Sequence, residues 1–244
     1  MIAIRSIPLF LFSLGILALA PMHSITADDS PSRHPFGEKF AKLDSLAVGK
    51  WWEKPQSALV NRNKVEISMH VERDQVVAFA LYLQDRGVLK LTAQLFPLMP
   101  DEAQEVRLEC KKDGKWTEVG REKVIFPGWS AHFRIEDWDA TQSVPYRVRH
   151  GDKAMFEGLI RKDPIDKDTI VVGNLSCNSS STPGPRAQIV ENLRAQNPDL
   201  LFFAGDQSYR HTEATLGWLE FGIQFREVMR DRPTITIPDD HDVG

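Results

Sequence analysis

Residues 197–209 read NPDLLFFAGDQSY, an apolar run that ends abruptly in a Gly-Asp pair. Two other apolar runs end in a similar way: residues 170–172 lead to Cys177, and residues 234–238 lead to the acidic cluster at 239–242. Helix-like stretches separate the three runs, so the order is β-α-β-α-β, which predicts a parallel sheet. Parallel strands end at one edge of their sheet, where open α/β sheets bind ligands. We therefore expect a thiol, carboxylates, a phenol and an imidazole to meet in one crevice.

Amphipathic patterns between the runs predict the two connecting helices. The first follows Pro185 and ends at Asn197-Pro198, because the residue before a proline disfavours helical dihedral angles. The second extends from about Thr212 to Arg230 and repeats its apolar residues at helical spacing. Together these elements predict an α/β domain at residues 168–244.

The first half of the sequence has a different pattern, with short strands separated by turn residues. Asp113-Gly114, for example, is a strong signal for a tight hairpin turn. Strands are expected at Val65–Val71, Val76–Leu83, Leu89–Phe96, Glu105–Lys111, Trp116–Val119, Ala131–Ile135, Tyr146–Val148 and Met155–Ile160. This spacing predicts an antiparallel β-sandwich of the immunoglobulin or fibronectin type at residues 58–162. The charged, proline-containing segment 161–168 marks the domain boundary.

The N-terminus has the pattern of a secretory signal peptide. In residues 1–27 an arginine precedes the apolar core Ile7–Ala20, and Ile25-Thr26-Ala27 forms a cleavage site. A single anchor helix is the alternative, although the apolar run is shorter than the roughly 18 residues of a membrane span. Residues 28–57 are expected to form a lead-in segment with a short helix at Phe36–Trp52. We therefore expect a secreted or periplasmic protein with no membrane span after signal cleavage.

Composition and charge narrow the class of protein. The 244 residues are 42% hydrophobic and 26% charged, which is ordinary for a globular protein and indicates neither disorder nor a membrane bundle. A formal net charge of −4 and a pI near 6.0 give no basic footprint for a nucleic-acid partner.

The second and third strand ends carry carboxylates and other residues suited to metal binding. A carboxylate at Asp206, turned out by the preceding glycine, can bridge two cations, and Tyr209 can return to the same centre. The cluster Asp239–Asp242 places three carboxylates and His241 within four residues, which repel one another unless a cation or solvent compensates. The plainer interpretations are a turn or helix-capping aspartate at 206 and a solvated acidic loop at 239–242.

The two cysteines leave two possibilities open. In an exported protein an even cysteine count predicts a disulfide between Cys110 and Cys177. Cys177, however, follows a strand end among ligand-type residues, where a bound metal ion would deprotonate its thiol. A disulfide would remove that thiolate from the site.

The three motifs, in order, resemble a known enzyme family. A strand followed by Ser-Cys, then NPDLxFxxGDxxY, then PDDHD is similar to the opening half of the alkaline phosphatase D (PhoD-like) family of metallophosphoesterases. The resemblance covers roughly Ile170–Gly244, and these enzymes commonly carry an N-terminal immunoglobulin-like domain. It implies that the sequence holds only the first part of the catalytic domain, because the family supplies further asparagine, histidine and aspartate ligands later in its chain.

The resemblance also implies a dinuclear metal site. Cys177 and Tyr209 would bind Fe³⁺, and Asp206 would bridge it to a second ion, Ca²⁺ in the best-understood members, with Zn²⁺ or Mn²⁺ as alternatives. Asp240 would bind or support the second ion. His241 would contact the phosphate or assist the leaving group as the catalytic residue.

The function expected from these features is phosphate-ester hydrolysis by a metal-activated hydroxide. The alternative is a non-catalytic exported module in which the β-sandwich binds a partner and the C-terminal part is a degenerate phosphatase domain. A hydrolase with Cys177 as nucleophile and His241 as base is a third interpretation, but the glycine-rich anion cradle expected before a helix is absent from its sequence.

Overall fold

The computed structural model describes Trp51 and residues 69–179, 186–211 and 213–243. The predicted signal peptide at residues 1–27 lies outside the described residues, as does the expected lead-in helix apart from Trp51. No helix within the described ranges is long and apolar enough to cross a membrane. Export therefore stays a prediction from the sequence.

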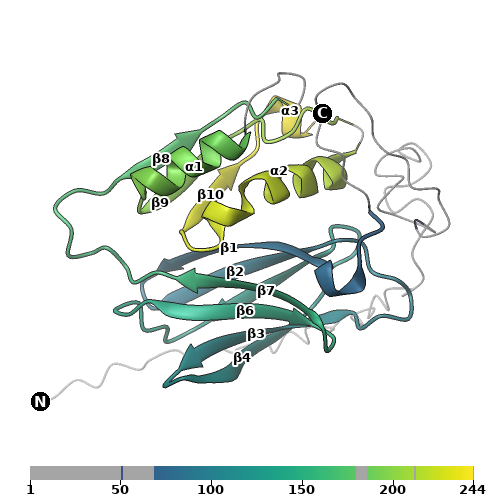
Figure 1. The fold of residues 1–244 in the computed structure, drawn as a ribbon, viewed down its shortest axis with the longest axis horizontal. Coiled ribbons are helices and arrows are strands. Elements are labelled where there is room, and N and C mark those ends of the chain that lie inside the picture. Colours follow the sequence, from purple (N-terminus) through teal and green to yellow (C-terminus); the bar gives the residue numbers. More distant parts are fainter. Residues whose placement is uncertain (1–50, 52–68, 180–185, 212, 244) are drawn as a thin grey trace, which may run out of the picture. The chain divides into compact units, whose positions relative to one another are not determined.

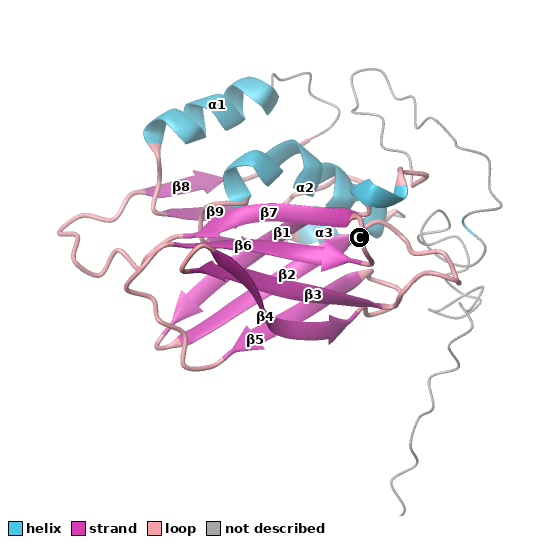
Figure 2. Cartoon of the chain, turned by 60° about the horizontal axis from the view of Figure 1, so that its bottom comes forward, coloured by secondary structure: helices cyan, strands magenta, loops and turns pink. Residues whose placement is uncertain are grey.

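Antiparallel strands form the first part of the described chain (Figures 1 and 2). One sheet has the strand order β1-β2-β5 and the other β4-β3-β6-β7. The strands are β1 (Val77–Asp85), β2 (Val88–Leu95), β3 (Glu105–Lys112), β4 (Lys115–Lys123), β5 (Ser130–Ile135), β6 (Val144–His150) and β7 (Ala154–Ile160), and the short 3-10 helix η3 (Arg73–Gln75) precedes them. The predicted hairpin is present, because Asp113 and Gly114 have φ of 50° and 77° between β3 and β4.

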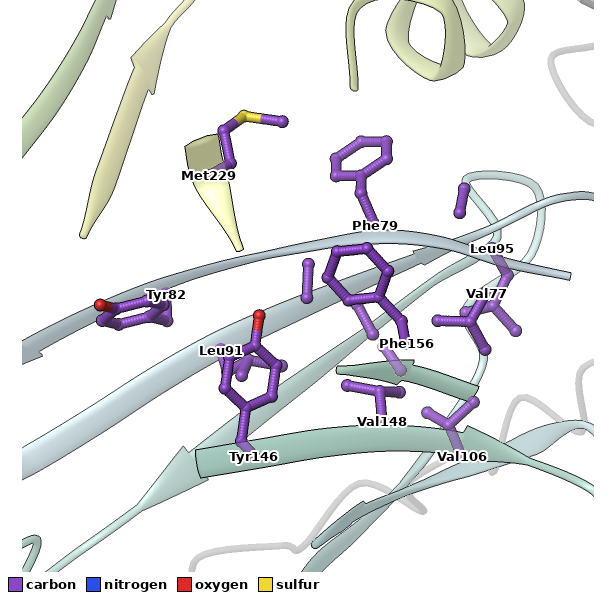
Figure 3. Close-up of a cluster of buried hydrophobic side chains, with 14 of the residues drawn as sticks. Val77, Phe79, Tyr82, Leu91, Leu95, Val106, Tyr146, Val148, Phe156 and Met229 are labelled. Carbon is purple, nitrogen blue, oxygen red and sulfur yellow. The ribbon is translucent and has the colours of Figure 1, made fainter. Parts of the chain in front are cut away.

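Seven of the eight expected strands match observed ones to within a few residues. The exception is Val65–Val71: residues 65–68 lie outside the described ranges, and residues 69–71 are not in a strand. Alternate residues of both sheets point into one core, where Tyr82 and Leu91 face Tyr146 (Figure 3). Two antiparallel layers are thus present, while the immunoglobulin-like assignment and the boundaries at 58–162 and 168–244 stay predictions.

A three-stranded parallel sheet forms the last part, in the order β10-β9-β8. Its elements are β8 (Val172–Leu175), α1 (Arg186–Gln196), β9 (Leu200–Ala204), α2 (Ala214–Met229), β10 (Thr234–Ile237) and α3 (Asp240–Val243). The expected β-α-β-α-β order is therefore observed. Phe203 of β9 packs edge-on against Phe221 of α2, with ring centroids 4.8 Å apart, which fixes this helix on the sheet.

The first of these strands differs from its prediction. Residues 170–172 were expected to form an apolar strand, but β8 begins only at Val172 and runs through Leu175. The side chains of Ile170, Val171 and Val172 are 44–48% exposed. Because β8 is an edge strand and pairs only with β9, a hydrophobic run is not required to mark it.

Helix α2 contacts the antiparallel part as closely as it contacts its own sheet. Trp218 donates its indole N–H to the side-chain oxygen of Gln94 on β2, at 3.1 Å. A Cβ atom added at Gly222 would lie 1.9 Å from the ring of Phe79 on β1, so only glycine admits this ring against the helix. The two kinds of sheet therefore share one packed interface through α2.

Candidate metal centre

The loop after β9 is shaped by two residues in the left-handed backbone region. Gly205 has φ of 87° and Asp206 has φ of 56°. A Cβ atom at Gly205 would lie 2.5 Å from the Cβ of Asp239, so the glycine also allows the loop after β10 to approach. Aspartate tolerates the left-handed region better than most residues. The turn places the Asp206 side chain between the ends of β8 and β10.

The two carboxylate oxygens of Asp206 face different groups. Oδ2 accepts a hydrogen bond from the Tyr209 hydroxyl at 2.9 Å and lies 3.7 Å from the Cys177 thiol sulfur. Oδ1 accepts a longer bond from the backbone N–H of His241 at 3.4 Å. The structure thus brings together Cys177, Asp206 and Tyr209, as the sequence predicts, and joins them to the third cluster through the other oxygen.

Asp206 has no basic partner within the described ranges, although it is only 7% exposed. No Lys or Arg side chain there forms an ion pair with it. Burying an isolated carboxylate is costly unless a cation compensates, and its neighbours are a thiol and a phenol, which are themselves metal ligands. The residues present therefore fit a bound cation.

Cys177 takes the same unusual backbone conformation as Asp206, with φ of 56°. Its backbone N–H donates to the carbonyl of Gly205 at 3.2 Å, and that of Asn178 donates to the carbonyl of Asp206 at 2.8 Å. These two bonds tie the end of β8 to the loop after β9. A left-handed cysteine is strained, and such strain occurs mainly at functional sites.

No disulfide joins the cysteines. Cys110 lies buried in β3 and Cys177 is exposed at the end of β8, and both are free. Burial raises the pKa of the Cys110 thiol to about 11, so this group stays protonated and inert. The alternative of a bridge between the halves is therefore wrong for this structure, and the Cys177 sulfur is available to a ligand.

Thiol titration provides a direct check on this arrangement. Without reductant, we expect one thiol to react quickly with 5,5′-dithiobis(2-nitrobenzoic acid) in the native protein, and two after denaturation. The fast thiol is Cys177, because Cys110 is 0% exposed. The variant Cys177→Ser should lose only the fast phase. If the unreduced, denatured protein shows no reactive thiol, the two cysteines are bridged.

The third cluster forms a single helical turn, α3, beside this loop. The Asp240 side chain is 81% exposed, and its Oδ2 lies 4.0 Å from Nε2 of His241. One ligand atom from each of Asp206, Asp240 and His241 fits within 4.8 Å of the others. The acidic cluster is therefore continuous with the carboxylate of Asp206, as the sequence predicts.

Asp242 has a role that the sequence did not reveal. Its Oδ2 accepts the backbone N–H of Asp206 at 2.7 Å and that of Asp239 at 3.1 Å. Its Oδ1 accepts the N–H of Ser208 at 3.1 Å. Backbone N–H groups that converge on one carboxylate form strong, directional hydrogen bonds. Asp242 thus clamps the loop after β9 to the loop after β10 and leaves Asp240 free.

A buried ion pair supports the same loop from the side of α2. Nε of Arg210 donates to the Glu220 carboxylate at 2.7 Å, and Nη1 to that of Glu213 at 3.3 Å. The side chains of Arg210 and Glu220 are 7% and 5% exposed. Because Arg210 directly follows Tyr209, this ion pair fixes the end of the loop after β9.

The Tyr209 hydroxyl is held in its protonated form. Desolvation raises its pKa, and the hydrogen bonds to Asp206 and Cys177 raise it further. The hydroxyl donates this proton in its hydrogen bond to Oδ2 of Asp206. A cation that takes both oxygens as ligands has to displace this proton, since metal ligands bind in their deprotonated form.

Two cavities flank the loop after β9. One of about 190 Å³ reaches Cys177, Asn178 and Arg186. The other, of about 230 Å³, reaches Trp218, His241 and Asp242. Either is large enough for a small group such as a phosphate and part of its leaving group, and Gln207 lines both.

Two solved structures are similar to part of this chain. The structure titled PhoD superposes with a TM-score of 0.56 at 16% sequence identity, over 68% of this chain and 39% of its own. A purple acid phosphatase, PPD1 from yellow lupin (Lupinus luteus), gives a TM-score of 0.49 at 14% identity, over 66% of this chain and 34% of its own. No protein-family model matches the sequence, and no curated protein matches it.

The likeness to PhoD is one of fold. It agrees with the expected arrangement of antiparallel layers and a parallel sheet, and it concerns about two fifths of that protein.

Proposed function

We propose that this protein is a metal-dependent phosphoesterase. The observation that carries the proposal is the buried carboxylate of Asp206, which has no Lys or Arg partner within the described ranges. One of its oxygens faces the Tyr209 hydroxyl and the other the backbone N–H of His241. A carboxylate in this arrangement is suited to bridge two ions. The PhoD-like fold and the order of the three motifs support the same function. The signal-like pattern of residues 1–27 supports export to a secreted or periplasmic location.

The donors divide into two groups around Asp206. Cys177 and Tyr209 lie on the side of Oδ2 and offer a thiolate and a phenolate, which as anionic donors suit Fe³⁺. Asp240 lies within reach of the Asp206 carboxylate and offers only oxygen, the ligand that Ca²⁺ prefers. The oxygen-rich half would also accept Mn²⁺, and the site as a whole Zn²⁺.

Ions held by Cys177, Asp206, Tyr209 and Asp240 would supply an acidified water and positive charge for the phosphoryl oxygens. The residues of the chain have the remaining tasks. Asp206 holds both halves of the site at one spacing, and Asp242 keeps its loop in place through three backbone bonds. His241 contacts the phosphoryl group or the leaving oxygen. Positioning and charge, not covalent chemistry, dominate phosphoryl transfer.

Reconstitution with metal tests this function. The purified full chain would be stripped with chelator, loaded with Fe³⁺ plus Ca²⁺, Zn²⁺ or Mn²⁺, and analysed for bound metal by mass spectrometry. We expect stoichiometric binding, and turnover of p-nitrophenyl phosphate or its bis ester that chelator abolishes. Inorganic phosphate should inhibit by competition. A folded protein that binds no metal in any combination would contradict the proposal.

A further inference from the structure

The imidazole ring of His241 is held on several sides. Its Nδ1 lies 3.3 Å from Nε2 of His211, and its ring lies against that of Tyr209, with centroids 4.2 Å apart. The backbone N–H of His241 bonds to Asp206. The remaining nitrogen, Nε2, faces Oδ2 of Asp240 at 4.0 Å. The two nitrogens of this ring therefore have different neighbours, a histidine and a carboxylate.

These neighbours decide where the proton of a neutral His241 lies. A carboxylate accepts hydrogen bonds and cannot donate them, so the proton is favoured on Nε2, which faces Asp240. Nδ1 then carries the lone pair and needs a donor. The group opposite Nδ1 is Nε2 of His211, and an imidazole that carries its proton there is such a donor.

His211 is well placed for this task although it is exposed. It directly follows Arg210, which the buried pair with Glu220 holds against α2. It also lies two residues after Tyr209, whose hydroxyl is bound to Asp206. The backbone on its N-terminal side is thus anchored at two consecutive residues, and its ring lies beside that of His241, with centroids 5.1 Å apart.

We propose that His211 is a positioning residue: it donates Nε2–H to Nδ1 of His241 and so keeps the proton of His241 on Nε2, facing the site. From there His241 donates to a phosphoryl or leaving-group oxygen. The part concerning substrate rests on the proposed function. The hydrogen bond and the tautomer belong to the protein alone. Hydrogen bonds of this kind typically change activity by about 10–100-fold when removed.

Nuclear magnetic resonance tests the tautomer without any metal or substrate. Two-bond ¹H–¹⁵N spectra of the stripped, ¹⁵N-labelled protein distinguish a protonated Nε2 from a protonated Nδ1. We expect the Nε2–H form for His241 in the wild type, and a mixture of both forms in His211→Ala. His211→Gln, whose amide can donate from a similar place, should retain the wild-type form. A His241 whose proton lies on Nδ1, or whose signals are unchanged in His211→Ala, would overturn the proposal.

Kinetics then connect the hydrogen bond to turnover. His211→Ala should lower kcat about 10–100-fold, with KM, bound metal and melting temperature near the wild-type values. His211→Gln should restore most of the loss. The control is His132→Ala, which removes an exposed histidine of β5 that bonds only to Thr92 and Ser130 and should change nothing. Equal kcat in His211→Ala and the wild type would also overturn the proposal, whereas an inactive wild type with the expected tautomer would contradict only the proposed function.

Discussion

Replacing Asp206 with Asn should abolish metal binding at the proposed bridged site and lower turnover by about 100- to 1,000-fold, because one oxygen ligand and a buried negative charge are lost. Asparagine preserves the shape of the side chain. It also tolerates φ of 56°, the backbone angle of Asp206, so the loop should keep its course. The measurements are metal stoichiometry by mass spectrometry and p-nitrophenyl phosphate kinetics.

The same substitution should not lower the stability of the metal-free protein and should raise it if it changes it at all. In the metal-free protein the buried carboxylate of Asp206 has no Lys or Arg partner within the described ranges. Replacing it with a neutral amide therefore removes an uncompensated negative charge. We expect the stripped Asp206→Asn protein to melt at an equal or higher temperature than the stripped wild type. Added metal should raise the melting temperature of the wild type only.

A matched control separates this effect from a general change of charge. Asp166→Asn removes a carboxylate that is 82% exposed and pairs with Lys162 at 3.7 Å, away from the strand ends. It should leave metal content, turnover and stability unchanged. Wild-type metal stoichiometry in Asp206→Asn would show that the carboxylate does not bridge the ions.

The candidate site residues that the sequence predicts are those whose signals are local. An apolar run followed by Gly205-Asp206 needs no knowledge of the rest of the chain, because the turn and the parallel sheet follow from short-range rules. The meeting of Cys177 with Asp206 then follows from topology, since β8 and β9 pair in parallel and end together. This is why ligand groups separated by 29 residues were expected at one place.

The roles within the third cluster were not predictable in the same way. Asp239, Asp240 and Asp242 are chemically identical, and their spacing does not show which of them turns inward. The choice depends on the end of β10 meeting the loop after β9, where three backbone N–H groups converge on Asp242. The pairing of His211 with His241 depends on the same meeting of distant segments.

In helix α2 the spacing of apolar residues predicts the buried face only in part. Its apolar residues predict that Leu216, Leu219, Ile223 and Met229 face inward. Three of them are buried, and Ile223 is partly buried. The pattern does not predict that Glu220 is buried among them, because an acidic residue at a helical position normally indicates the solvent side. Glu220 is buried because Arg210, at the end of the loop after β9, forms a hydrogen-bonded ion pair with it.

Removing one member of that pair should strongly destabilise the protein. Glu220→Ala leaves the Arg210 guanidinium, which is 7% exposed, with only the partly buried Glu213 as a partner. Breaking a buried ion pair in this way typically costs about 3–5 kcal/mol of unfolding free energy. We expect a loss of this size in urea denaturation followed by circular dichroism. Glu227→Ala on the same helix, which removes pairs of an exposed glutamate, should cost under about 1 kcal/mol.

A double substitution distinguishes the pair from its separate side chains. In Arg210→Met with Glu220→Leu both charges are gone and the volume is kept, so much of the lost stability should return, as is typical when apolar residues replace a whole buried pair. Metal affinity should not return with it, because Arg210 also fixes the backbone that follows Tyr209. Stability and metal affinity recovering together would show that the ion pair serves only the fold. Recovery of stability alone would show that the charges of Arg210 and Glu220 serve the geometry of the loop after β9. In that case the charged pair is less stabilising than an apolar contact would be.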